Sequence, residues 1–99
     1  MSLDIRIKYS QWHLNSPIEV YLVDPKTGEL YIDAKYVKFK ALIKVDGAFR
    51  PFDLSLPVKP ALRALGSLPA KAKNCKMLRV VLQKEKRGKL VLLDWQIMN

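Results

Sequence analysis

Side chains able to perform covalent or metal chemistry are few in this sequence. It contains one histidine, His13, one cysteine, Cys75, and no glycine-rich loop of the GxxxxGKS/T or GxGxxG type that would cradle phosphate groups. A structural zinc ion needs three or four clustered ligands, which these two residues do not supply. Lys73 and Lys76 would favour a thiolate at Cys75, but only His13 is available as the base that a cysteine nucleophile needs. The sequence therefore predicts no catalytic residue, no metal site and no cofactor.

The acidic residues are the other possible source of chemistry, because a two-metal nuclease directs several carboxylates into one pocket. Six of the nine acids lie in residues 1–49, but no local motif gathers them. Asp24 and Asp46 fall at turn positions, where aspartate side chains brace the backbone. A metal-dependent nuclease is therefore a minor alternative, and we expect the protein not to be an enzyme. The six acids are Asp4, Glu19, Asp24, Glu29, Asp33 and Asp46.

The net charge is the strongest feature of the composition. Eighteen Lys and Arg residues against nine Asp and Glu residues give a charge of +9. Residues 50–99 hold eleven of the bases and only three of the acids, so nearly all of the surplus lies in the second half. A field of this kind favours an anionic partner: nucleic acid first, and an anionic membrane surface or an acidic protein second. The alternative is that the charge serves only solubility.

The stretch from 35 to 45 combines positive charge with an aromatic side chain at strand spacing. Its odd-numbered residues from Val37 to Val45 are apolar, whereas three of the even-numbered ones are lysines. Single-stranded nucleic acid is held by cations that contact phosphates and by aromatic rings that stack on bases. The alternative is a solvated strand surface that resists edge aggregation. The face consists of Tyr36, Lys38, Lys40 and Lys44, with Tyr21, Tyr31 and Trp12 as further stacking candidates.

Two more basic elements lie in the second half. Residues 83–89, QKEKRGK, crowd bases at a predicted hairpin tip, and a projecting hairpin can straddle a phosphate backbone. An ordinary solvated turn is the alternative. Lys71, Lys73 and Lys76 follow the only predicted helix and flank the same predicted surface. From this half of the chain, the predicted phosphate contacts are Arg79, Lys84, Lys86, Arg87 and Lys89.

Alternation and turn chemistry predict the elements that position these residues. Strands are expected over 3–9, 18–24, 29–33, 35–45, 49–56, 76–84 and 89–98, with 18–33 forming a hairpin around Asp24 to Gly28. Pro51 marks its strand as an edge or bulged strand. A short helix is expected over 57–66, with Gly66 at its end. The expected fold is α+β: a strand-dominated small single domain over 1–99, with an antiparallel twisted sheet or partly open barrel of about six strands and one short helix.

The last predicted strand, over 89–98, has apolar residues on both faces, including Trp95. Such a strand is either central in its sheet or covered by something else, so a homodimer through residues 89–98 is one expectation. The longest apolar runs reach only three or four residues, which excludes a membrane span. No signal peptide is recognisable and the cysteine is single, so we expect an intracellular, cytoplasmic protein.

These patterns favour a non-enzymatic nucleic-acid-binding protein, more sequence-tolerant or single-strand-specific than sequence-specific, with DNA or RNA as the partner. The plan of a small twisted sheet with basic loops and surface aromatics is similar to that of the OB-fold and other small single-strand binders. This is a likeness of plan from which function does not follow. The alternative is a small accessory or assembly protein that binds another protein through its apolar C-terminal strand.

Overall fold

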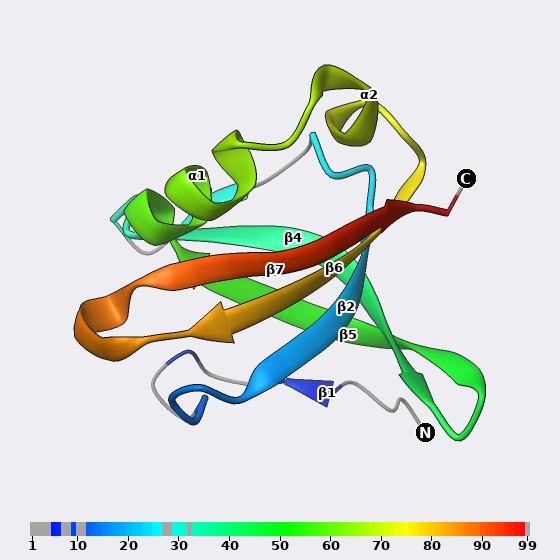
Figure 1. The fold of residues 1–99 in the computed structure, drawn as a ribbon, viewed down its shortest axis with the longest axis horizontal. Helices are drawn as coiled ribbons and strands as arrows, with labels where there is room; N and C mark the ends of the chain where they lie inside the picture. Colours follow the sequence, from blue (N-terminus) through cyan, green and yellow to red (C-terminus); the bar gives the residue numbers. More distant parts are fainter. Residues whose placement is uncertain (1–4, 7–8, 10–11, 27–28, 32, 99) are drawn as a thin grey trace.

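The computed structural model describes residues 5–6, 9, 12–26, 29–31 and 33–98 of the 99-residue chain. Strands dominate, and two helices follow the fifth strand (Figure 1). A turn of 3₁₀ helix, Lys86–Gly88, joins the last two strands. In chain order the elements are β1 (Ile5–Arg6), β2 (Pro17–Val23), β3 (Glu29–Tyr31), β4 (Tyr36–Val45), β5 (Ala48–Pro57), α1 (Val58–Gly66), α2 (Ala70–Lys73), β6 (Met77–Lys84) and β7 (Leu90–Ile97).

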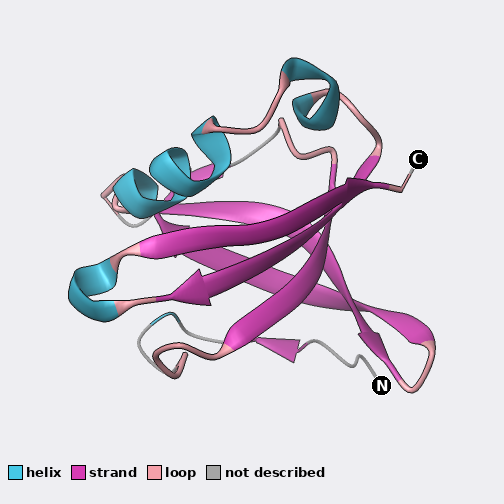
Figure 2. Cartoon of the chain, in the orientation of Figure 1, coloured by secondary structure: helices cyan, strands magenta, loops and turns pink. Residues whose placement is uncertain are grey.

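The strands form one twisted sheet in the order β1-β5-β4-β2-β6-β7, with β3 paired to β4. Every pairing is antiparallel except that of β1 with β5. The helices α1 and α2 lie together on one side of the sheet (Figure 2). The α+β, strand-dominated prediction is confirmed. In the described part of the chain β7 pairs only with β6, so the sheet is open rather than closed into a barrel.

Strand alternation builds the hydrophobic core. On β4 the predicted split holds, because Phe39 and Ala41 are buried on one face while Lys38 and Lys40 are exposed on the other. The helix α1 covers the apolar face with small residues, and Ala61 and Ala64 are buried. The largest side chains that are fully buried in this core are Leu22, Leu56, Leu78, Leu82, Val20 and Val80.

Turn chemistry is confirmed at the β4–β5 hairpin. Asp46 and Gly47 have φ values of 50° and 80°, the two positive values that a tight hairpin turn requires.

Pro51 lies beside the point where β1 joins the free side of β5 at Phe52 and Asp53. Pro51 has no amide hydrogen to donate, and it precedes the two residues of β5 that pair with β1, so this short pairing does not depend on it. Of the strand predicted over 3–9, only Ile5–Arg6 is seen as β1, and residues 3, 4, 7 and 8 lie outside the described residues.

The hairpin predicted over 18–33 is wrong. Both sides of β2 are occupied, by β4 on one side and β6 on the other, so β3 has no place beside it. Asp24 adopts a φ of 50° and its amide donates a hydrogen bond to the Lys76 carbonyl at 2.9 Å, which carries the chain away from β2. The chain then reverses at Asp33 and Ala34, which also have positive φ, and β3 pairs with the start of β4. The local hairpin is therefore β3–β4.

The prediction that the last strand has apolar residues on both of its faces is also wrong. The pairing of β6 with β7 shifts by one residue, because Val81 lies opposite Asp94 whereas Leu82 lies opposite Leu92. Leu93 is the extra residue of this β-bulge. The bulge reverses the alternation, so apolar residues assigned to opposite faces lie on the core side. Leu90, Leu92, Trp95 and Ile97 all pack in or against the core.

Candidate nucleic-acid interface

The strand lysines lie on the sheet face opposite the helices, as alternation predicts. Lys38, Lys40 and Lys44 are all exposed there. Lys38 Nζ forms an ion pair of 3.2 Å with Asp53 Oδ1 of β5, and Lys40 pairs in register with the same aspartate. Tyr36, at the head of the strand, is half-buried. The face is therefore less positive than β4 alone suggests.

Lys44 is paired in register with Phe49, an aromatic residue that sequence reasoning missed as a stacking candidate. The Lys44 ammonium lies 5.7 Å from the centre of the Phe49 ring, which is 45% exposed. Tyr21 supports this ring in an edge-to-face contact, with centroids 4.9 Å apart and planes at 89°. The turn at Asp46 could have revealed the pair, because a two-residue turn places Phe49 opposite Lys44.

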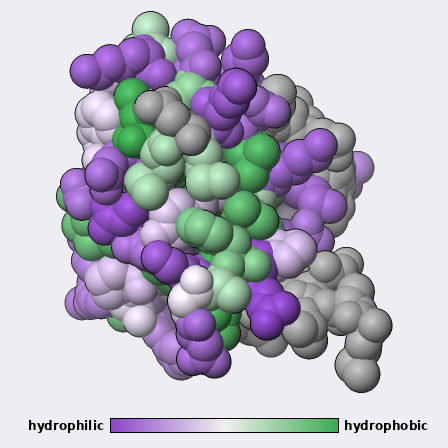
Figure 3. All heavy atoms as spheres, turned by 90° about the vertical axis from the view of Figure 1, so that its right-hand side faces the viewer, coloured by the Kyte–Doolittle hydropathy of each residue, from purple (hydrophilic) through white to green (hydrophobic). Residues whose placement is uncertain are grey.

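The β4–β5 hairpin reaches a side of the molecule where hydrophobic side chains gather in a band between hydrophilic ones (Figure 3). Val45 and Phe49, which flank the turn of this hairpin closely, are exposed, and so is Met98 near the chain end. An exposed apolar surface beside lysines is suited to contacting the flat faces of bases while the ammonium groups contact phosphates.

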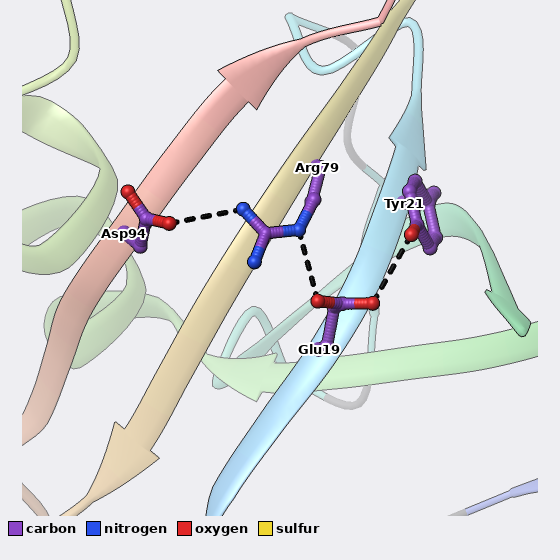
Figure 4. A network of polar contacts seen from close by, with 4 residues as sticks. All are labelled: Glu19, Tyr21, Arg79 and Asp94. Carbon is purple, nitrogen blue, oxygen red and sulfur yellow. Dashed lines mark hydrogen bonds and ion pairs between the residues drawn. The ribbon is translucent and has the colours of Figure 1, made fainter.

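Arg79 lies at the centre of a polar network on the same sheet face (Figure 4). Its Nε donates to Glu19 Oε2 at 2.9 Å and its Nη1 donates to Asp94 Oδ2 at 3.0 Å. The Tyr21 hydroxyl donates to the other Glu19 oxygen at 3.1 Å. The bond to Arg79 lowers the pKa of Asp94, and burial, followed by the bond to Glu19, raises the pKa of Tyr21. Two carboxylates balance the charge of Arg79, so a phosphate would have to displace them to bind it.

The predicted basic tip lies between β6 and β7, and its cations have different surroundings. Lys86, Arg87 and Lys89 are exposed around the 3₁₀ turn, where Arg87 has a φ of 64°. Lys84 is half-buried, because its Nζ donates to the Tyr9 carbonyl at 2.7 Å and lies 4.4 Å from the centre of the Tyr9 ring. The three exposed cations are therefore the ones that can meet a phosphate without breaking a contact with Tyr9.

Two of the predicted stacking candidates are buried, which corrects that expectation. Trp12 is only 6% exposed, packs in the core, and donates from Nε1 to the Ser16 carbonyl at 2.7 Å. Tyr21 lies on the outer face as expected but is only 5% exposed. Both are structural residues in this fold. The side chain of Tyr31 lies outside what the structure describes.

The structure does not gather the basic elements into one patch. The β6–β7 tip and the β4–β5 turn lie at opposite ends of the molecule in Figure 1, along its longest extent of 34 Å. The third element, Lys71 and Lys73 of α2 with Lys76, lies in the helical layer. Residues 58–76 hold five bases and no acid, so much of the surplus charge lies in that layer.

Groups suited to other chemistry are not gathered among the described residues. In the described ranges no three His, Cys, Asp or Glu side chains come together as a metal site. The half-buried Cys75 Sγ lies 3.1 Å from the Ala72 carbonyl oxygen and 3.4 Å from the Met77 carbonyl oxygen, and its single hydrogen can be donated to either. None of the helices in the described part of the chain has the length and hydropathy to cross a bilayer.

Comparison with known proteins gives no match: no protein family fits the chain, and no curated protein or solved structure resembles it significantly.

Proposed function

We propose that this protein binds single-stranded or otherwise sequence-tolerant nucleic acid without catalysing a reaction. The observation that carries the proposal is the Lys44–Phe49 pair, an exposed ring and an ammonium group side by side on an open sheet face. An exposed cation–π contact contributes only about 0.5–1 kcal/mol. The Lys44 ammonium can therefore move from the ring to a phosphate at little cost, leaving a ring face for a base.

The order in which the strands are connected and paired supports the same surface as the site of nucleic-acid binding. The long strands β2, β4 and β5 form a meander, α1 follows, and β6 returns beside β2 before β7. This order resembles the five-stranded OB-fold, in which the face of the second and third strands and the loop between the last two bind oligonucleotides. In this chain those parts carry Lys40, Lys44, Phe49 and the β6–β7 tip. The resemblance is one of connectivity only.

Phosphate contacts are assigned to five exposed cations of β4 and the tip, for which the described residues show no ion pair. They are Lys40, Lys44, Lys86, Arg87 and Lys89. Arg79 and Lys84 hold structural contacts, and Lys38 is paired with Asp53. Because Lys44, next to the β4–β5 turn, and the β6–β7 tip lie at opposite ends of the molecule, a bound strand would have to cross the face between them (Figure 1).

Fluorescence anisotropy tests the proposal with labelled thymidine oligonucleotides of 5 and 15 residues, a 15-base-pair duplex and a matching RNA. We expect saturable binding of the 15-mer at about 50 mM salt and much weaker binding of the 5-mer, which cannot reach both groups. Phe49→Ala should weaken binding by about 1–3 kcal/mol, the usual effect of losing one stacked base. Leu62→Ala, which removes an exposed apolar side chain from the helical layer, is the matched control. Absence of binding by the wild-type protein would reject the proposal.

A second candidate function is association with another protein through β7. Its support is that β7 ends the sheet in the described chain and that Leu93, at the bulge, is 48% exposed. Unpaired strand edges can pair with another chain, and a second copy would give a symmetric dimer. The apolar residues of β7 do not require a partner chain, because the bulge turns most of them toward the core of the same chain.

A further inference from the structure

The proposed function leaves unused an apolar pocket of about 490 Å³ between the helical layer and the sheet. Leu22 and Phe39 of the sheet line it from one side, and Ala61 and Leu65 of α1 line it from the other. Leu22 and Ala61 are almost completely buried, so the inner part of the pocket is hydrophobic. Its volume lies within the range of about 300–1,000 Å³ typical of small-molecule sites.

Two lysines are the charged residues among the described lining. Lys26 belongs to the turn after β2, and Lys73 ends α2. Both are exposed, and the Lys73 ammonium lies 3.4 Å from the carbonyl oxygen of Gly66 at the end of α1. The surrounding helical segment, residues 58–76, contributes five bases and no acid. The pocket therefore combines an apolar interior with an accessible positive charge.

We infer that this pocket binds an amphiphilic organic anion: a medium-chain aliphatic carboxylate whose chain enters between α1 and the sheet and whose head meets Lys26 and Lys73. The apolar lining favours a hydrocarbon chain, because each methylene removed from water tightens binding by about fourfold. The two ammonium groups favour a negative head over a neutral or positive one. A nucleic-acid backbone offers no such chain, so this ligand class differs from the one proposed for the opposite sheet face.

Isothermal titration calorimetry with hexanoate, octanoate and decanoate tests the inference on the full chain. We expect saturable binding of one molecule, with affinity rising by roughly an order of magnitude for each two added methylenes. Decanol should bind about tenfold more weakly than decanoate, because it lacks the charge. Equal affinity along the carboxylate series, or no saturable binding of decanoate, would overturn the proposal.

A matched pair of double variants distinguishes binding in the pocket from general attraction of decanoate to the positively charged protein. Lys26→Gln with Lys73→Gln should weaken decanoate binding by about tenfold and leave decanol binding unchanged. Lys71→Gln with Lys76→Gln removes the same charge from residues outside the lining and should change decanoate affinity by less than about twofold. An equal loss in both variants would contradict a defined site.

Amide chemical shifts locate the bound chain independently of affinity. Decanoate should shift the backbone resonances of Ala61 and Leu65 and leave those of Lys86 and Arg87 unchanged. It should not compete with an oligonucleotide, because the pocket lies on the helical side of the sheet. Shifts confined to the sheet face, or loss of oligonucleotide binding in parallel with decanoate binding, would contradict the assignment.

Discussion

The Lys84 ammonium donates a hydrogen bond to the Tyr9 carbonyl at 2.7 Å and lies 4.4 Å from the centre of the same residue's ring. The Tyr9 hydroxyl in turn donates to the Gly88 carbonyl at 2.9 Å, and the ring meets Trp12 edge-on at 6.0 Å. Burial raises the pKa of Tyr9 above the ordinary tyrosine value. The two hydrogen bonds, from Lys84 to Tyr9 and from Tyr9 to Gly88, join residues 75 and 79 positions apart and hold the base of the basic tip against the start of the chain.

Removing the charge of Lys84 should therefore destabilise the fold. Lys84→Met keeps most of the aliphatic stem but loses the hydrogen bond and the cation–π contact, so the free energy of unfolding should fall by about 1–2 kcal/mol. Urea denaturation followed by tryptophan fluorescence measures it. Lys86→Met, at an exposed position of the same tip, should change stability by less than about 0.5 kcal/mol. Equal effects of the two variants would contradict the structural role given to Lys84.

The Arg79 network predicts a contribution to stability that depends on acid pH. The pKa of Asp94 is lowered in the folded chain by its bond to Arg79. This contribution to stability is therefore complete at pH values above the pKa of an aspartate in the unfolded chain, about 3.9. It is lost as the pH falls through the folded pKa. Urea midpoints between pH 7 and pH 2 should therefore fall less steeply for Asp94→Asn than for the wild type. Asp46→Asn, the same change in the β4–β5 turn, is the control, and identical slopes for Asp94→Asn and the wild type would contradict the network.

The raised pKa of Tyr21 predicts a contribution to stability that is lost at alkaline pH. Burial and the bond to Glu19 raise its folded pKa, so its contribution is complete below the unfolded value of about 10 and is lost as the pH rises toward the folded pKa. Tyr21→Phe should be about 1 kcal/mol less stable at pH 7, because it loses this hydrogen bond. Its stability should also fall less steeply than that of the wild type between pH 9 and pH 12. A parallel decline of the two proteins would contradict the raised pKa.

The candidate dimer gives a prediction with a simple measurement. If two copies pair through β7, Leu93→Lys should shift sedimentation at micromolar concentration from a dimer to a monomer of 11.4 kDa. Leu62→Lys, at an apolar position in the helical layer that is 67% exposed, should leave the dimer intact. A wild-type monomer at these concentrations ends the dimer proposal.

Alternation along the sequence was enough to predict the exposed lysines of β4, because a strand period of two assigns faces without knowledge of partners. It failed at Leu93, because a one-residue bulge reverses every later face and depends on the partner strand. Turn chemistry found the Asp46–Gly47 hairpin but misplaced β3, because β2 takes both of its partners from distant strands. Trp12 and Lys84 were assigned to a binding surface for a similar reason, since their burial and contacts come from distant segments.

The salt dependence of binding distinguishes phosphate contacts from stacking. Each phosphate contact on a single strand contributes about −0.7 to the slope of log affinity against log salt, so about five contacts predict a slope of roughly −3.5. Lys86→Ala with Arg87→Ala should flatten this slope by about 1–1.5 and weaken all sequences equally, because phosphates carry no sequence information. Lys71→Ala with Lys76→Ala removes the same charge from the helical layer and should leave the slope nearly unchanged.

Stacking should respond differently to the same titration. Phe49→Ala should lower affinity while leaving the slope as it is, because no counterion is released from an aromatic ring. Tyr36→Ala should have a smaller effect than Phe49→Ala, because Tyr36 is half-buried whereas Phe49 is 45% exposed. A slope that flattens equally for the tip and helical-layer variants, with no loss for Phe49→Ala, would indicate attraction to the overall positive charge and no defined interface on the β4–β5 face.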